Sequence, residues 1–121
     1  MLRCLIVDDN ASFLEAAATL LKREGVTVAG VASSTEDALR RAQELEPDVV
    51  LVDIRLGSES GLDLARRLAE TDGDTTVILI SSHPGAEFAD LIAETPAAGF
   101  VPKTELSAAA IRRLVNAPRE T

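Results

Sequence analysis

Cysteine, aromatic residues and positive charge are all scarce in this sequence. The single cysteine, Cys4, excludes an internal disulfide, and its position in an apolar run is typical of a small buried core residue. Tryptophan and tyrosine are absent, which removes the aromatic surfaces on which single-stranded nucleic acids stack. The formal net charge of -8 argues against direct binding of nucleic acid, because phosphate contacts need an excess of lysine and arginine.

Long hydrophobic runs are missing as well. No apolar run approaches the roughly 20 residues that a membrane span needs, and the N-terminus lacks the layout of a signal peptide. A hydrophobic content of 46% nevertheless suits a globular chain, and 121 residues suit one compact domain. We therefore expect a single cytoplasmic domain over residues 1–121, in which residues 117–121 form a tail or the start of a linker.

Two kinds of apolar pattern alternate along the chain. Short segments rich in β-branched residues are typical of strands buried on both faces of a parallel sheet, and they cover 2–7, 26–31, 49–52, 76–80 and 99–101. Helical spacing of apolar residues predicts helices over 10–24, 34–47, 61–70, 84–94 and 106–117. Asn10 is expected to cap the first helix and Gly25 to end it, while Ser34 and Asp37 form a variant of the capping box at the second.

This alternation predicts the fold class. Strands that alternate with helices through short connections give right-handed crossovers and a parallel sheet covered on both sides. We expect an α/β three-layer sandwich of the flavodoxin-like type, with a five-stranded parallel sheet in the order 2-1-3-4-5 and five helices. In such sheets ligands bind outside the carboxyl ends of the strands, where the strand order reverses.

Polar residues stand at the predicted carboxyl ends of four strands. Asp8 and Asp9 follow the first strand, Asp53 the third, Ser81 the fourth and Lys103 the fifth. Adjacent carboxylates raise each other's pKa unless a cation compensates them, and hard carboxylate oxygens suit Mg²⁺. Asp53 is then left as a nucleophile, and the metal with Lys103 can neutralise a phosphoryl group as it transfers to that carboxylate.

The order of these elements resembles the receiver domain of two-component response regulators, over essentially the whole chain. The matching residues are Asp8, Asp9, Asp53, Ser81, Phe100 and Lys103. The resemblance implies that Asp53 accepts a phosphoryl group from a sensor histidine kinase or a phosphotransfer protein. It also implies that Ser81 hydrogen-bonds this group and that Lys103 pairs with it. The implied ligands of Mg²⁺ are Asp8, Asp9, Asp53 and the backbone carbonyl of Arg55.

The same resemblance implies a switch between two states. In the family, movement of the hydroxyl residue toward the phosphate is coupled to inward rotation of an aromatic ring, which implies Ser81 and Phe100 as the switch residues. The affected surface, formed by the fourth helix, fifth strand and fifth helix, is expected to contact a downstream protein, a fused output domain or a second copy of the chain. Arg55 and His83 occupy positions that influence the lifetime of the acyl phosphate in this family. Many receivers have a cis proline after the lysine, whereas here Pro102 precedes it, so the state of the bond before Pro102 stays open.

Each residue also has a purely structural interpretation. An isolated Asp8–Asp9 pair before a helix is more often a turn or an N-cap than a metal site. Asp53 could cap a helix, Phe100 could simply fill the core, and Lys103 could be a solvated charge. Their joint occurrence at the strand ends of one sheet edge favours the functional interpretation.

Three functional hypotheses remain. The leading one is a receiver that acts through protein contacts and catalyses only its own phosphorylation and dephosphorylation. The second is the N-terminal receiver of a DNA-binding transcriptional regulator, because the segment PKTEL resembles receivers attached to helix-turn-helix domains. The third is a Mg²⁺-dependent phosphohydrolase with an aspartyl-phosphate intermediate, similar in chemistry to the haloacid dehalogenase group. That group needs a second aspartate where this chain has Arg55, and a cap region for which the chain has no room.

Overall fold

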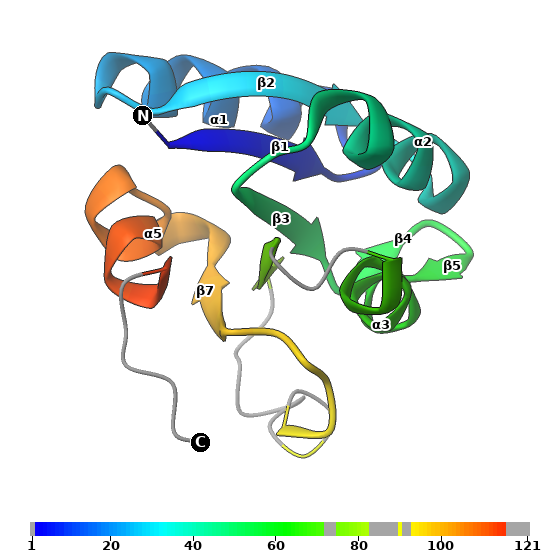
Figure 1. The fold of residues 1–121 in the computed structure, drawn as a ribbon. Helices are drawn as coiled ribbons and strands as arrows, with labels where there is room; N and C mark the ends of the chain where they lie inside the picture. The colour runs from blue at the N-terminus through cyan, green and yellow to red at the C-terminus, as the bar shows by residue number, and fades with distance from the viewer. Residues whose placement is uncertain (1, 72–74, 83–89, 91–92, 116–121) are drawn as a thin grey trace.

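A five-stranded parallel sheet lies at the centre of the protein (Figure 1). The computed structural model describes residues 2–71, 75–82, 90 and 93–115. The sheet has the order β2-β1-β3-β6-β7, and all four neighbouring pairs are parallel. Its strands are β1 (Arg3–Val7), β2 (Thr27–Ala32), β3 (Val49–Asp53), β6 (Thr76–Ser81) and β7 (Gly99–Pro102). In chain order this is 2-1-3-4-5, so the predicted fold class is confirmed.

A small antiparallel hairpin follows β3 and was not predicted. It consists of β4 (Arg55–Leu56) and β5 (Glu59–Ser60), which pair with each other and not with the central sheet. Two-residue strands leave almost no periodic signal in a sequence, and Gly57 at the turn is the main sequence trace of this element.

Four α-helices are described, and their bounds agree with the predicted ones to within two residues where both ends are described. They are α1 (Ala11–Arg23), α2 (Thr35–Leu45), α3 (Gly61–Thr71) and α5 (Ala108–Val115). The last begins two residues later than predicted, because a 3₁₀ turn, η2 (Lys103–Glu105), follows β7 directly. The helix predicted over 84–94 lies largely outside the described residues.

The helix ends follow the predicted capping chemistry. The side chain of Asn10 accepts a hydrogen bond from the Phe13 N–H at 3.2 Å, and Ser34 accepts one from the Asp37 N–H at 3.2 Å. Each cap satisfies a backbone donor that the first helical turn leaves without a partner. Both predicted N-caps are therefore confirmed, and they fix the positions at which α1 and α2 leave the sheet.

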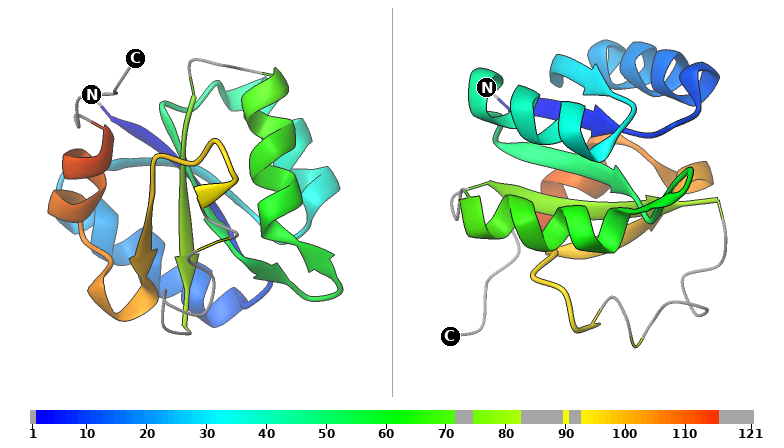
Figure 2. Two further views of the ribbon diagram at one scale, coloured as in Figure 1. Left: turned by 90° about the horizontal axis from the view of Figure 1, so that it is seen from below. Right: turned by 90° about the vertical axis from the view of Figure 1, so that its right-hand side faces the viewer.

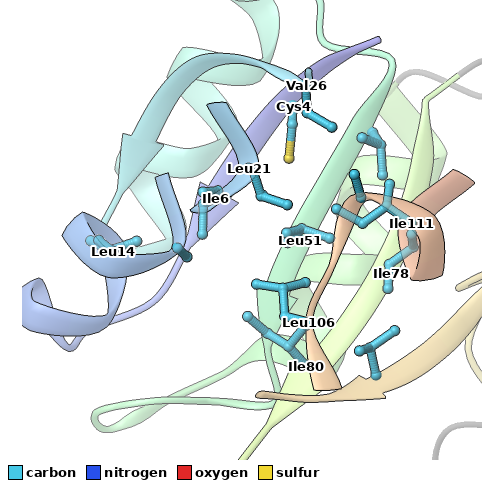
Figure 3. Close-up of a cluster of buried hydrophobic side chains, with 14 residues drawn as sticks. Cys4, Ile6, Leu14, Leu21, Val26, Leu51, Ile78, Ile80, Leu106 and Ile111 are labelled. Carbon is cyan, nitrogen blue, oxygen red and sulfur yellow. The ribbon is translucent and has the colours of Figure 1, made fainter. Parts of the chain in front are cut away.

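The helices cover both faces of the sheet (Figure 2). α1 and α5 pack on one face and α2 and α3 on the other, so the buried residues form two separate apolar clusters. Figure 3 shows the cluster beneath α1 and α5, which includes Cys4, Leu21, Leu51, Ile78 and Ile111. Burial of an aliphatic side chain of this size stabilises a fold by roughly 2 kcal/mol. The two clusters hold the strands rigidly, and with them the loops at the strand ends.

Cys4 lies in this core, as predicted, and is completely buried. Burial raises the pKa of its thiol to about 12, so the thiol stays protonated and acts as a small apolar side chain. Within the described part of the chain, none of the helices has the length and apolar content required to cross a membrane.

Candidate functional site

Three carboxylates from two neighbouring strands meet at one edge of the sheet. Asp8 and Asp9 follow β1 directly, Asp53 is the last residue of β3, and these strands pair side by side. One carboxylate oxygen from each residue lies within 4.8 Å of the others. Asp8 is completely buried, Asp53 is 7% exposed and Asp9 faces solvent. The predicted acidic cluster therefore exists, with two buried members and one accessible member.

The two oxygens of Asp8 have different partners. Its Oδ1 accepts a hydrogen bond from the Asn10 N–H at 2.9 Å. Its Oδ2 is buried. The ammonium of Lys103 lies 2.5 Å from this oxygen, and this ion pair compensates the buried charge of Asp8.

Asp53 is held by two donors, one on each of its oxygens. Its Oδ1 accepts a hydrogen bond from the Arg55 N–H at 3.2 Å, and its Oδ2 accepts one from the Lys103 ammonium at 3.1 Å. The pKa of Asp53 is nevertheless raised above its usual range, because burial and the nearby Asp8 charge outweigh the attraction of Lys103. The site thus contains a carboxylate that is oriented but under-compensated, which makes it receptive to further positive charge.

Lys103 reaches this cluster from the far end of the chain. It opens η2 directly after β7, and its side chain is only 15% exposed. Burial acts to lower the pKa of Lys103, but the contacts with Asp8 and Asp53 outweigh burial and leave the pKa raised. The side chain therefore carries a positive charge at neutral pH.

The donor set fits a magnesium ion. Three carboxylates within a few ångströms provide hard oxygen ligands, and the Oδ2 of Asp8 is a buried anionic oxygen that already attracts a cation, the Lys103 ammonium. The exposed carboxylate of Asp9 leaves room on the solvent side for the waters and phosphate oxygens that Mg²⁺ prefers to retain. Asp8, Asp9 and Asp53 are thus the residues that could hold the ion.

Ser81 and Phe100 lie on the two strands beyond β3. Ser81 ends β6 and is 2% exposed, and it stands one position past Ile80, the residue in register with Asp53. Phe100 lies on β7, is half-buried and packs against the apolar cluster on the α2–α3 face. The bond before Pro102 is trans, since the described residues contain no cis peptide. His83 lies outside the described residues, and the roles assigned to all these residues remain predictions.

Two features around Asp53 were not found from the sequence. Gly61 begins α3 with its N–H bonded to the carbonyl of Ile54 at 2.8 Å, and an added Cβ would lie 1.8 Å from the backbone oxygen of Asp53. Glu59 accepts a hydrogen bond from the Thr35 N–H at 2.9 Å, which ties the β4–β5 hairpin to the start of α2. The only feature of the sequence that indicates the close approach of Gly61 to Asp53 is the glycine itself, at the start of a predicted helix. Nothing local signals the second.

Phe13 is a third residue whose position at the site was not foreseen. The sequence places it only within the helix predicted over 10–24. In the structure, the ammonium of Lys103 lies 4.4 Å from the centroid of its ring. The available signal was its place in the first turn after Asp8 and Asp9, on the same edge of the sheet as Lys103.

Comparison with known proteins agrees with this arrangement. Residues 4–116 match the model of the response regulator receiver domain family. Response regulator GacA from Pseudomonas aeruginosa is 31% identical over 121 residues, which cover 99% of this chain and 55% of GacA. The transcription regulator of virulence factors BvgA from Bordetella pertussis is 32% identical over 103 residues, which cover 85% of this chain and 49% of BvgA. The chain thus spans about half the length of these curated relatives.

Solved structures show the same fold. A LuxR-family two-component response regulator from Aurantimonas sp. SI85-9A1 superposes with a TM-score of 0.84 at 27% identity, covering 98% of this chain and 88% of the other. The chain belongs to the response regulator receiver domain family. Its relatives are signalling proteins of two-component systems.

Proposed function

We propose that this domain is a phosphoacceptor of a two-component phosphorelay, and that Asp53 receives the phosphoryl group from a sensor histidine kinase or a phosphotransfer protein. The observation that carries the proposal is the convergence of three carboxylates and one ammonium at a single edge of the sheet. Asp53 shares with Asp8 an Oδ2 contact to Lys103 and an Oδ1 contact to a backbone N–H, but Asp53 is 7% exposed whereas Asp8 is completely buried. Such an arrangement fixes the orientation of a nucleophile before the donor arrives.

The transfer itself is a displacement at phosphorus. An oxygen of the Asp53 carboxylate forms a bond to phosphorus, while the bond from phosphorus to the donor's leaving nitrogen or oxygen breaks. The phosphoryl group keeps its charge, so catalysis depends on positioning and on neutralising that charge. Asp8, Asp9, Asp53 and, as a further proposed ligand, the carbonyl of Arg55 would hold a magnesium ion, which would supply part of this neutralisation. Lys103 supplies the remainder through its ammonium, which already lies between Asp8 and Asp53.

The phosphorylated state is proposed to act through a switched surface. Phosphorylation adds a charge of about -1.5 to -2, and this charge shifts an equilibrium only if the two states contact it differently. Ser81 and Lys103 are proposed to contact the phosphoryl group more closely in the active state. Phe100 on β7 is proposed as the switch residue whose ring rotates inward. Arg55 and His83 are proposed to set the lifetime by screening the water that attacks the acyl phosphate. The face that includes β7 and α5 then meets the downstream partner, and a homodimer through this face is one form of that contact.

Mass spectrometry after incubation with acetyl phosphate tests the proposal. With Mg²⁺ the chain should gain the mass of one phosphoryl group, and with EDTA the gain should fall to background. Asp53→Asn should abolish the gain, whereas Asp63→Asn should keep it, because Asp63 is an exposed carboxylate in the first turn of α3. Equal gain in Asp53→Asn would refute the assignment of the acceptor. Sustained release of phosphate over many turnovers would favour the phosphohydrolase hypothesis instead.

A second proposal concerns the protein in which the domain acts. GacA and BvgA are regulators about twice as long as the matched segment, and BvgA is described as a transcription regulator. These relatives support the hypothesis that this receiver is the N-terminal part of a DNA-binding regulator. Residues 117–121 would then begin the linker. Sequencing of the encoding gene beyond the codon for Thr121 distinguishes this hypothesis from a receiver that acts alone through protein contacts.

A further inference from the structure

The ring of Phe13 lies against the Lys103 ammonium. The ammonium lies 4.4 Å from the ring centroid, within the range in which a cation is attracted to the face of an aromatic ring. On its other sides the ammonium meets the carboxylates of Asp8 and Asp53. Because the Lys103 side chain is only 15% exposed, water screens the contact with the ring weakly.

The position of the ring is fixed by the start of α1. The Phe13 N–H donates to the side chain of Asn10, whose own N–H donates to Oδ1 of Asp8. Phe13 is half-buried and packs against the apolar cluster beneath α1 and α5. The ring is therefore anchored to the same turn that carries the acidic pair, and its distance from the site is set by the backbone and by packing.

The ring differs from the two carboxylates in one respect that matters for function. A metal ion or a phosphoryl group at the acidic cluster competes with Lys103 for the oxygens of Asp8 and Asp53, so these partners of the ammonium change during the reaction. The face of Phe13 is uncharged and does not bind the metal, so its attraction for the ammonium persists. An ammonium held on one side by a constant partner stays directed at the acceptor when its anionic partners are withdrawn.

We infer that Phe13 is a positioning residue for phosphoryl transfer, which holds the Lys103 ammonium over the acceptor through the face of its ring. The inference rests on the proposed function for its consequence in the reaction, but the contact itself can be tested separately. The competing interpretation is that Phe13 only fills the core. Phe13→Leu and Phe13→Tyr separate the two, because leucine keeps an apolar side chain without a π face and tyrosine keeps the face.

The contact is tested by proton NMR of the Lys103 side chain in the full chain, with Mg²⁺ absent and then added. A ring face shields nearby protons, so the Lys103 ε-methylene should resonate upfield of a solvent-exposed lysine in the wild type and in Phe13→Tyr. The upfield shift should disappear in Phe13→Leu and should persist on addition of Mg²⁺ in the wild type. A wild-type resonance at the position of an exposed lysine, or a shift that Mg²⁺ abolishes, would overturn the inference whether or not the chain is phosphorylated.

The consequence is tested by the rate of phosphorylation with acetyl phosphate at saturating Mg²⁺. Phe13→Leu should react roughly fivefold more slowly than the wild type, and Phe13→Tyr should react within about twofold of it. Leu14→Val is the matched control, because Leu14 is buried in the same cluster on α1 and should keep the wild-type rate at a comparable loss of stability. Urea unfolding of each variant establishes that comparison.

The outcomes separate the inference from the proposed function. If Phe13→Leu is phosphorylated as fast as the wild type, Phe13 is only a packing residue. The same conclusion follows if Phe13→Tyr loses as much phosphorylation rate as Phe13→Leu. Failure of the wild type itself to gain a phosphoryl group would overturn the proposed function and the catalytic role of Phe13 together. In that case the NMR measurement still decides whether the ring positions the ammonium.

Discussion

The ammonium of Lys103 lies closer to Asp8 than to Asp53. Its Nζ is 2.5 Å from Oδ2 of Asp8 and 3.1 Å from Oδ2 of Asp53. Asp8 is completely buried, so without a bound metal this ammonium is the main charge that compensates it. Lys103 therefore contributes to the stability of the fold as well as to the proposed chemistry.

Replacement of Lys103 by alanine should destabilise the metal-free protein by roughly 3 kcal/mol, because it leaves the buried Asp8 carboxylate uncompensated. Saturating Mg²⁺ should recover much of this loss, since a divalent cation at the acidic cluster replaces the missing charge. Urea unfolding in EDTA and in Mg²⁺ measures both quantities. Lys22→Ala, at an exposed position of α1, should change stability by less than about 0.5 kcal/mol in either condition. The same loss with and without Mg²⁺ would contradict the shared role of metal and lysine.

Asp53→Asn should raise the stability of the metal-free protein at neutral pH. The folded-state pKa of Asp53 is raised by burial and by the Asp8 charge, so the ionised carboxylate disfavours folding above that pKa. Protonation removes the penalty, so the gap between variant and wild type should shrink as the pH falls through the folded-state pKa. Thermal unfolding in EDTA between pH 7 and pH 4 follows this gap. A variant that is less stable at pH 7, or a gap that widens in acid, would show that the ion pair with Lys103 dominates.

Gly61→Ala should destabilise the protein by about 3 kcal/mol or more, because the added Cβ would meet the backbone oxygen of Asp53 at 1.8 Å. The backbone cannot yield without moving the acceptor, so phosphorylation should slow as well. Gly30→Ala is the matched comparison, because the one close contact of its Cβ would be with the flexible tip of Leu45, at 2.8 Å, and no backbone atom is near. Chemical unfolding and phosphorylation rates of the two variants test this. Equal, small losses in both would mean that the start of α3 adapts more readily than its geometry indicates.

Glu24→Ala should cost about 1 kcal/mol. Its carboxylate accepts a hydrogen bond from the Ala108 N–H at 2.7 Å, and so the end of α1 caps the start of α5. Loss of the cap should also speed hydrogen exchange in the first turn of α5. Glu44→Ala removes an exposed carboxylate from α2 and should leave both the stability and the exchange rate unchanged. An unaltered exchange rate at the start of α5 in Glu24→Ala would argue against the cap.

Most of the fold could be predicted because its signals are local. Apolar runs such as 76–80 and caps such as Asn10 and Ser34 determine strands and helix ends through interactions between near neighbours. The β4–β5 hairpin was missed because its strands are two residues long, too short for any periodic pattern. The late start of α5 was missed because η2 and the contact with Glu24 are tertiary features.

The candidate site was predictable to the extent that strand order determines it. Once β1 lies beside β3, Asp8 and Asp53 must end at the same edge, and their residue types can be read directly. The approach of Phe13 to Lys103 could not be read in this way, because it depends on side-chain directions from two elements that are far apart in the sequence. The same holds for Gly61, whose constraint is a contact with a backbone oxygen and leaves no trace in residue type other than the glycine itself.

The division of the core into two layers bears on how the molecule tolerates change. The central sheet separates the cluster beneath α1 and α5 from the cluster beneath α2 and α3. The changes in unfolding free energy should be additive for substitutions in different clusters. They should not be additive for neighbouring residues within one cluster, because each substitution changes the packing around the other. Substitutions in the cluster beneath α2 and α3 can therefore change the stability of the protein while α1 and α5, on the face that carries Phe13, keep their packing.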